Sequence, residues 1–367
     1  MSTSFYRTYR PKTLADLLGQ EQVTTVLKNA ASAGKLGHAY LFYGPRGTGK
    51  TTAARLLAKI ACCQTRAKDA KFRAKGEPCN TCPTCTEIDL GRSLDVIEID
   101  AASNRGIDEI RALKETIRTA PVGNHYKVYI VDEAHMLTGA AFNALLKTLE
   151  EPPAHAVFVL ATTEYDKLPA TIVSRTQRFG FRRASKKAII EKLRTITDAE
   201  KIKADDDAIE LVAAAAEGSF RDAESILEQL ATSSGTITLA AVESVTGRTG
   251  LRRVDQLAAL ILARDLPAAL AEIGKLQEEG ANLVQFMKDL IHYLRKILSL
   301  KLSPALAETL GAEITAEELK RMAELGTKAD PAKTAALLKA LIRGYSEMRY
   351  SPFASVPLEI ALIENLS

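Results

Sequence analysis

The sequence has no tryptophan, only 5% aromatic residues, and no apolar run near the roughly 20 residues that a helix needs to cross a bilayer. Its start, from Met1 to Lys12, is polar and lacks the apolar segment of a signal peptide. From these absences we expect neither an integral membrane protein nor a secreted one. We therefore expect a cytoplasmic protein with no membrane partner.

An excess of charge of one sign is missing as well. The formal net charge is +4, from 49 Lys and Arg against 45 Asp and Glu. Because DNA-binding domains usually concentrate basic charge on one face, this balance permits a DNA partner without indicating one. The 367 residues, of which 46% are hydrophobic, are enough for two or three domains with separate cores.

Short β-branched or aromatic runs alternate with amphipathic stretches between Leu41 and about Gln177, which is typical of a parallel sheet covered by helices. After about Arg183 the apolar spacing becomes helical. Residues 205–207 are expected to open one helix, and 236–239 to form a turn or a short extended link. The predicted strands are 39–42, 96–99, 128–131 and 157–161.

This pattern predicts an α/β protein with three domains. Residues 1–180 contain the sheet, with an insertion at about 62–86. Residues 181–243 form a small helical domain, and residues 244–367 form a second, all-helical one. In parallel sheets of this kind, functional sites lie at the carboxyl ends of the strands.

A glycine-rich segment follows the first predicted strand and opens a predicted helix. It matches the pattern G-x-x-x-x-G-K-[ST], whose glycines let backbone N–H groups surround phosphate oxygens at a helix N-terminus. We expect Lys50 to reach the β- and γ-phosphates of ATP and Thr51 to bind Mg²⁺. The alternative is a glycine-rich turn that matches by accident. The segment is Gly44, Pro45, Arg46, Gly47, Thr48, Gly49, Lys50 and Thr51.

Two adjacent acids end the predicted strand 128–131. A P-loop enzyme needs an acid on a neighbouring strand to hold Mg²⁺, and we assign this role to Asp132. Glu133 is expected to polarise the attacking water as a general base. A structural role is harder to explain, because unpaired acids are costly to desolvate. With Ala134 and His135 the acids also spell a DEAH-type helicase signature, although the chain is short for two motor domains.

Three further polar residues carry weaker signals. Thr163 follows the fourth predicted strand, where a threonine pair more often caps the next turn than contacts phosphate. Arg175 follows Pro169 on a short segment, and Arg221 lies near the start of a predicted helix. Surface arginines are usually solvated or in ion pairs, so their residue type alone leaves phosphate contact open.

The five cysteines cluster between Cys62 and Cys85. Disulfides are not expected in a reducing compartment, so the clustering indicates a metal. The spacing C-x15-C-x2-C-x2-C suits a tetrahedral structural Zn²⁺ site, and an iron-sulfur cluster or four unligated thiols are the alternatives. Cys62 is expected to be a small buried hydrophobic residue. The predicted ligands are Cys63, Cys79, Cys82 and Cys85.

The same insertion contains a basic run with a single acid, Asp69. Such a run can contact DNA phosphates, but charge runs are usually solvated loops, and we favour the solvated loop. The basic residues are Arg66, Lys68, Lys71, Arg73 and Lys75.

Longer blocks are more specific than the P-loop. Together with the cysteine cluster they make the chain resemble the gamma/tau subunits of the bacterial DNA polymerase III clamp loader, which are AAA+ ATPases. The resemblance covers essentially the whole chain. The blocks are Tyr9-Arg10-Pro11, Gly19-Gln20, 38–42, the P-loop, 98–103, 132–137, 142–153 and 347–351.

The resemblance implies a RecA-like sheet core, a small helical lid and a C-terminal helical collar through which subunits assemble. It implies three ATP-binding copies of the chain in a five-membered ring with a delta and a delta prime subunit. Such a ring opens a sliding clamp and loads it onto primed DNA during replication.

The resemblance also implies residue roles. Arg175 matches the arginine finger that reaches a neighbouring subunit's nucleotide in trans, with Thr176 in place of the usual cysteine. Thr163 matches the sensor after the fourth strand, and Arg221 matches the lid arginine that senses the γ-phosphate. Tyr9-Arg10-Pro11 matches the segment near the adenosine.

We therefore expect an ATP-hydrolysing motor subunit of the clamp loader. The alternatives are a scaffold subunit of the same complex with a vestigial ATP site and, further away, a DEAH-type helicase. The insertion is longer and more basic than the resemblance implies. Because the chain ends where the third domain should end, we expect either the short form of the subunit or a truncated long form.

Overall fold

The computed structural model describes residues 4–366 except 105, 124, 234, 247–250, 312–315, 349–350, 352 and 354. The chain folds into two compact units. The first contains Met1–Ala184 and Ser219–Arg221, and the second contains Ser185–Gly218 and Asp222–Ser367. In the sequence block 347–351, Arg349 and Tyr350 lie outside the described residues.

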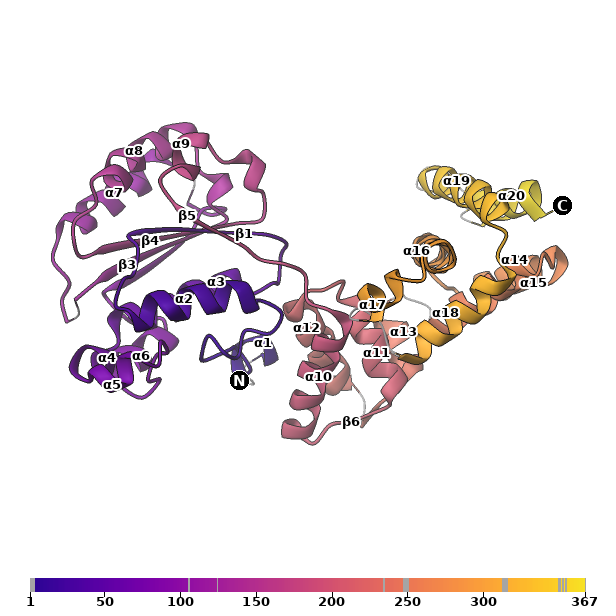
Figure 1. Ribbon diagram of the computed structural model, residues 1–367, viewed down its shortest axis with the longest axis horizontal. Helices are drawn as coiled ribbons and strands as arrows, with labels where there is room; N and C mark the ends of the chain where they lie inside the picture. Colours follow the sequence, from indigo (N-terminus) through magenta and orange to yellow (C-terminus); the bar gives the residue numbers. More distant parts are fainter. Residues whose placement is uncertain are drawn as a thin grey trace. The chain divides into compact units, whose positions relative to one another are not determined.

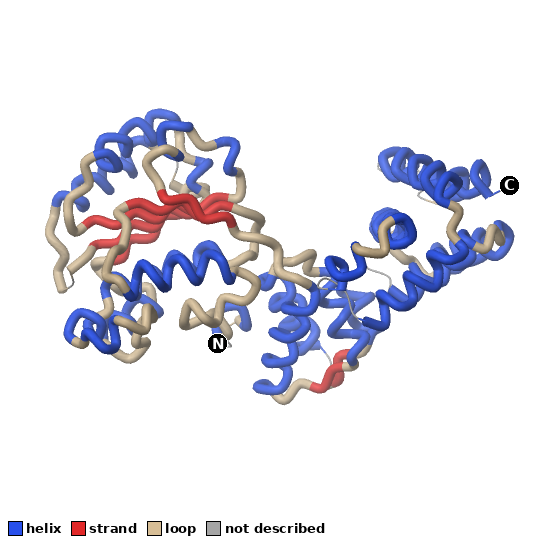
Figure 2. Tube along the Cα trace, viewed as in Figure 1, coloured by secondary structure: helices blue, strands red, loops and turns tan. Residues whose placement is uncertain are grey.

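A five-stranded sheet with the order β2-β3-β4-β1-β5 forms the centre of the first unit (Figures 1 and 2). All its strand pairs are parallel, as predicted, so the carboxyl ends of the strands share one edge. The register places Tyr43 opposite Thr162 and Asp100 opposite Asp132. The strands are β1 (Ala39–Tyr43), β2 (Val96–Asp100), β3 (Lys127–Asp132), β4 (Ala156–Thr162) and β5 (Gln177–Gly180).

Helices cover both faces of this sheet, with α2 and α3 on one side and α7, α8 and α9 on the other (Figure 1). Strand β4 is buried along its whole length, which explains its continuous apolar sequence. Leu27 and Leu57 pack in the core on one face, and Leu145 and Ile172 in the core on the other. The helices are α2 (Glu21–Ser32), α3 (Lys50–Cys62), α7 (Ile107–Arg118), α8 (Gly139–Glu150) and α9 (Ala170–Val173).

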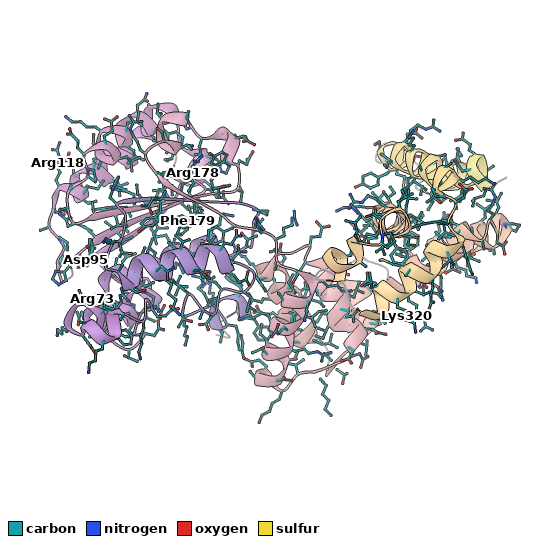
Figure 3. All side chains as sticks on the ribbon, viewed as in Figure 1. Arg73, Asp95, Arg118, Arg178, Phe179 and Lys320 are labelled. Carbon is teal, nitrogen blue, oxygen red and sulfur yellow. The ribbon has the colours of Figure 1, made fainter. Side chains whose placement is uncertain are left out.

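Strand β5 was not predicted from the sequence. It lies at the edge of the sheet, pairs only with β1, and Phe179 is its one buried residue (labelled in Figure 3). The ring of Phe179 packs against Phe42, with ring centroids 5.7 Å apart. An edge strand with a single buried side chain has neither an apolar run nor a repeated alternation, so its sequence gives no strand signal.

The insertion after α3 folds into short helices rather than the predicted solvated loop. The solvated reading is wrong for Arg66, which is 5% exposed. Its guanidinium donates to the carbonyl oxygens of Ala31 at 2.9 Å, Ile60 at 3.2 Å and Arg73 at 3.1 Å, so it anchors the insertion to the core. The other basic residues of the run, Lys68, Lys71, Arg73 (Figure 3) and Lys75, are exposed. The helices are α4 (Gln64–Lys68), α5 (Ala70–Arg73) and α6 (Pro83–Asp89).

The described residues of the second unit form helices and one short pair of strands. Asp205 precedes α11, and Asp206 and Asp207 lie in its first turn, where acids favour the helix dipole, so the predicted helix start is confirmed. Of the predicted turn or link at 236–239, Thr236 and Ile237 form β7, which pairs with β6. The first elements of this unit are α10 (Lys186–Glu200), β6 (Lys203–Ala204), α11 (Asp206–Ala215), α12 (Phe220–Ser233), β7 (Thr236–Ile237) and α13 (Leu239–Thr246).

The C-terminal helices share one apolar core, to which α16 contributes Phe286, Leu290 and Leu294. The predicted boundary between residues 243 and 244 falls inside α13, which packs on α11; the division into three domains remains a prediction. No helix of the described residues combines the length and apolar character needed to cross a membrane. The helices are α14 (Leu251–Leu262), α15 (Leu266–Glu278), α16 (Leu283–Leu302), α17 (Leu306–Gly311), α18 (Ala316–Lys328), α19 (Pro331–Met348) and α20 (Val356–Leu366).

Candidate functional site

The glycine-rich segment lies between β1 and α3, at the carboxyl edge of the sheet. Gly47 has a φ of +73°, and a Cβ there would lie 1.8 Å from the Ser219 hydroxyl. A Cβ at Gly44, whose φ is +142°, would lie 2.3 Å from the Phe181 carbonyl oxygen. Only glycine fits these two positions without strain, so the loop keeps the bare backbone that a phosphate cradle requires.

Lys50 begins α3 and turns its side chain back over the loop. Its ammonium group donates to the carbonyl oxygens of Gly44 at 2.8 Å and Pro45 at 2.7 Å. The side chain is buried, and this burial lowers the pKa of Lys50, while Glu133 and Asp132 oppose the effect. A buried ammonium group held by two exchangeable backbone acceptors is available to an anion that enters the loop.

Thr51, the last residue of the glycine-rich segment, is hydrogen-bonded to Asp132 at the end of β3. The Thr51 hydroxyl donates to Asp132 Oδ2 at 2.7 Å, although the two residues are 81 positions apart. The backbone N–H of Glu133 donates to the other carboxylate oxygen at 3.0 Å. Burial raises the pKa of Asp132, and the Thr51 bond lowers it. The structure thus brings together the two residues predicted to hold Mg²⁺.

Glu133 and Thr163 are also brought together. The hydroxyl and the backbone N–H of Thr163 donate to Glu133 Oε2 at 2.9 Å and 3.2 Å. Glu133 has a φ of +47°, a left-handed conformation that non-glycine residues rarely adopt and that clusters at functional sites. The predicted base and the predicted sensor therefore form one hydrogen-bonded pair.

His135 belongs to the same group, although the sequence indicated it only as part of a helicase signature and of the 132–137 block, with no role of its own. Its Nδ1 lies 2.9 Å from Thr162 Oγ1 and 3.4 Å from Glu133 Oε2, and its Nε2 lies 3.2 Å from Glu164 Oε1. The side chain is 6% exposed. Its closeness in sequence to the strand-end acids marked His135 as a candidate, but only the fold shows which side chains the ring contacts.

Residues 219–221 pack against the glycine-rich loop. The backbone N–H of Phe220 donates to the Gly47 carbonyl oxygen at 3.2 Å. The guanidinium of Arg221 lies 5.0 Å from the centre of the Tyr6 ring. The predicted lid arginine is thus held beside the N-terminal segment, and neither Ser219 nor Tyr6 was identified from the sequence.

Tyr9, Arg10 and Pro11 follow helix α1 (Phe5–Thr8), and the ring of Tyr9 lies 6.1 Å from that of Phe5. Leu17, further along the chain, lies beside the loop. A Cβ at Gly49 would lie 3.2 Å from Leu17 Cδ2. The adenosine role assigned to the Tyr9-Arg10-Pro11 block remains a prediction.

Arg175 has a different set of partners. It follows α9 and forms an ion pair with Glu150, the last residue of α8. Its Nε donates to Glu150 Oε1 at 2.9 Å, and its Nη1 donates to the Thr171 carbonyl oxygen at 2.8 Å. The predicted arginine finger is therefore bonded to acceptors in its own subunit.

The cysteine cluster is closed and compact. The four sulfur atoms of Cys63, Cys79, Cys82 and Cys85 all lie within 4.8 Å of one another, and those of Cys79 and Cys85 are 3.9 Å apart. A tetrahedral Zn²⁺ with Zn–S bonds of about 2.3 Å separates its sulfurs by about 3.8 Å, so the donor set fits this ion. A hydrogen bond from the Cys85 thiol lowers the pKa of Cys63, which favours a thiolate there.

Cys62, the cysteine outside the predicted ligand set, is confirmed as a buried core residue. Cys62 is 3% exposed, and its thiol donates to the Tyr126 carbonyl oxygen at 3.4 Å. Burial raises the pKa of Cys62 to about 12, so it stays a neutral thiol.

Three family descriptions match consecutive parts of the chain. Residues 19–185 match "DNA polymerase III, delta subunit", residues 188–235 match "DNA polymerase III clamp loader subunit, ATPase lid domain", and residues 237–367 match "DNA polymerase III subunits gamma and tau domain III". The DNA polymerase III subunit gamma of Buchnera aphidicola is 33% identical over 362 residues, which cover 98% of each chain. The chain belongs to the gamma/tau family of DNA polymerase III subunits.

The resemblance seen in the sequence is thereby confirmed. So is the AAA+ fold class, since the parallel sheet covered by helices is followed by a part that matches an ATPase lid domain and by a helical C-terminal region.

Other gamma/tau relatives are longer. The DNA polymerase III subunit tau of Bacillus subtilis is 40% identical over 364 residues, covering 98% of this chain and 62% of the relative. The chain thus spans less than two thirds of that relative's length. Among solved structures, the Thermotoga maritima RuvB Holliday junction branch migration motor covers 72% of this chain and 85% of its own, with 20% identity and a TM-score of 0.47.

Proposed function

We propose that this gamma/tau family member is an ATP-hydrolysing motor subunit of a bacterial clamp loader. In this proposal it forms a five-membered cytoplasmic ring with further copies of itself and with delta and delta prime subunits, and the ring places sliding clamps on primed DNA. The observation that carries the proposal is the 2.7 Å contact between Thr51 Oγ1 and Asp132 Oδ2 below the P-loop. Adjacent oxygen ligands of an octahedral Mg²⁺ lie about 2.9 Å apart, so this pair fits the ion.

The loop residues bind the nucleotide in this scheme. Lys50 exchanges the carbonyl oxygens of Gly44 and Pro45 for phosphate oxygens, and the backbone N–H groups from Gly47 to Thr51 surround the phosphates. When bound, Mg²⁺ neutralises charge that develops on the γ-phosphoryl group. Thr51 and Asp132 hold this ion in place.

Glu133 acts on the attacking water. Its carboxylate now accepts two hydrogen bonds from Thr163, so it is oriented before substrate binds. Both bonds reach Oε2, which leaves Oε1 to accept a proton from water, and the Thr163 hydroxyl can turn from Oε2 to the γ-phosphate when nucleotide binds. This exchange ties the sensor role of Thr163 to the base role of Glu133.

The two arginines come from separate places in the chain. Arg221 senses the γ-phosphate from the lid, and Arg175 reaches the nucleotide of a neighbouring subunit in trans. Because Arg175 would come from a different subunit than the loop that holds the nucleotide, the nucleotide state sets the geometry of the ring. Tyr9, Arg10 and Pro11 are proposed to lie beside the adenosine.

The cysteine cluster is proposed to hold a structural Zn²⁺. Four buried or half-buried sulfurs leave no open coordination position, so the site has no part in the chemistry. Its role is to fix the insertion, from which Glu77 accepts a hydrogen bond from the Leu14 backbone at 2.7 Å.

Reconstitution tests this proposal. The purified chain alone should hydrolyse ATP slowly, and the ring formed with delta and delta prime subunits should be stimulated by the clamp together with primed DNA. Absence of stimulation, with nucleotide binding intact, would count against the motor role. Absence of nucleotide binding would point instead to a scaffold subunit.

A further inference from the structure

The guanidinium group of Arg175 is held on two edges by its own subunit. Nε and Nη2 both donate to Glu150 Oε1, with Nε at 2.9 Å. Nη1 donates to the Thr171 carbonyl oxygen at 2.8 Å and to Ser174 Oγ at 3.2 Å. An arginine has five N–H donors, so these contacts leave one N–H of Nη2 for an outside acceptor.

The position of Glu150 is not explained by the helix that carries it. Glu150 is the last residue of α8, where the helix dipole is negative and an acidic side chain is unfavourable. Arg175 compensates this charge. An acid that breaks a local rule of helix stability and meets one specific arginine indicates a functional position.

We propose that Glu150 is a positioning residue that aims Arg175 toward the nucleotide of the adjoining subunit. This inference rests on the proposed in-trans role of Arg175. Glu150 fixes the plane of the guanidinium through its Nε and Nη2 edge, so that the remaining Nη2 donor faces a phosphate at the subunit boundary. Because an arginine side chain has many rotamers, a free finger would spend little time in the productive orientation.

The strength of the Arg175–Glu150 ion pair decides whether Glu150 orients Arg175 or holds it away from the nucleotide. The side chains of Arg175 and Glu150 are 32% and 48% exposed. An exposed ion pair shifts an equilibrium by less than about tenfold, whereas an arginine finger accelerates turnover by about 10³- to 10⁵-fold. The pair is too weak to keep Arg175 from a triphosphate, but strong enough to narrow its orientations.

The test uses the reconstituted ring with clamp and primed DNA. Glu150→Ala should lower the stimulated kcat by about 3- to 10-fold, the most that an exposed ion pair can contribute to orienting Arg175, while KM for ATP and nucleotide affinity change less than about twofold. Glu150→Gln keeps an acceptor oxygen and should fall between wild type and Glu150→Ala. Glu151→Ala, at the next exposed acid, is the matched control and should resemble wild type.

A double-mutant cycle separates positioning from general stability. In an Arg175→Ala background, Glu150→Ala should lower turnover no further, and thermal melts of all variants should coincide within a few degrees. If Glu150→Ala raised turnover, Glu150 would hold Arg175 away from the nucleotide, and the proposal would be overturned. Turnover of Glu150→Ala equal to that of Glu151→Ala would also overturn it. If Arg175→Ala kept full stimulated turnover, both the arginine-finger role of Arg175 and the positioning role of Glu150 would be wrong. If Arg175→Ala lost turnover and Glu150→Ala kept it, only the positioning role of Glu150 would be wrong.

Discussion

The candidate nucleotide site and the cysteine cluster both gather polar side chains, but they are assembled in opposite ways. The cluster uses four residues between Cys63 and Cys85, and its sulfurs face one another within 4.8 Å. The nucleotide site draws on residues between Gly44 and Arg221 that lie on separate elements. A local, closed donor set suits an ion that stays, whereas groups on separate elements suit a ligand that comes and goes.

The nucleotide site contains hydrogen bonds between protein groups that a ligand could replace. In the nucleotide site, Lys50 bonds to two loop carbonyls, Thr51 to Asp132, and Thr163 to Glu133. These bonds satisfy buried polar groups and can be exchanged for bonds to a ligand. Substitutions in the nucleotide site should therefore change nucleotide binding or turnover with little effect on stability. Substitutions in the cluster should lower stability with little effect on nucleotide binding.

The largest expected effect is on turnover. Arg175→Ala should lower clamp- and DNA-stimulated ATP hydrolysis by about 10³-fold or more, because an arginine finger stabilises charge in the transition state. Nucleotide affinity should change less than about threefold, since the finger serves another subunit. Steady-state hydrolysis and equilibrium binding measure the two quantities. A comparable loss of affinity in the isolated chain would instead place Arg175 in its own subunit's site.

The next effect is on binding. Lys50→Ala should weaken ATP affinity by about 100-fold or more, because it removes a buried cation from the phosphate cradle. Calorimetric titration with Mg-ATP measures the change, and Lys68→Ala, on the exposed side of α4, is the control. The free energy of unfolding without nucleotide should fall by less than about 1 kcal/mol, since only two exchangeable bonds are lost. Unaltered affinity would contradict the assignment of the loop.

The cysteine cluster should show the opposite separation. Cys63→Ser should abolish stoichiometric metal and lower the free energy of unfolding by about 3 kcal/mol or more, because metal binding is coupled to folding of the insertion. ATP affinity should fall by less than about fivefold. Metal analysis and chemical denaturation test this, and Cys62→Ala should keep the metal because Cys62 lies in the core outside the cluster. Iron or an absence of metal in wild type would refute the zinc assignment.

The smallest expected effect lies outside both sites. Glu224 is 6% exposed, and burial raises its pKa from 4.5 to about 7, with Lys192 at 4.0 Å lowering it in part. Between these values the folded protein holds a proton that the unfolded chain has lost, so stability falls as the pH rises through this window. Glu224→Gln should therefore raise the free energy of unfolding by about 2 kcal/mol at pH 8 and by little at pH 5. Chemical denaturation at pH 5 and pH 8 measures the gain in the free energy of unfolding. An equal gain at both pH values would contradict this prediction.

Much of the sheet and of the nucleotide site was predictable from the sequence. Strands β1, β3 and β4 are buried and have continuous apolar runs, and the P-loop and the strand-end acids follow strands in the order that a parallel sheet requires. The sequence also indicated the four-cysteine donor set through its spacing. Each of these signals is local, because the residues involved lie close together in the chain.

The features that were missed depend on contacts between distant residues. Edge strand β5 has one buried side chain, and Arg66 looks like any other member of a basic run until four backbone carbonyls surround it. The place of His135 among Glu133, Thr162 and Glu164 follows from the strand register, and that of Tyr6 from its contact with Arg221. Sequence spacing contains no information on such pairings.

In the proposed ring, nucleotide held by one copy of this chain is hydrolysed with an arginine from another. Mixing two inactive variants tests it most directly: Lys50→Ala keeps Arg175 but should not bind ATP, and Arg175→Ala should bind ATP but lacks the arginine. Reconstituted rings that contain both variants should recover part of the stimulated hydrolysis, because some Arg175→Ala copies then adjoin an intact arginine. Mixed rings as inactive as those made from either variant alone would contradict the account.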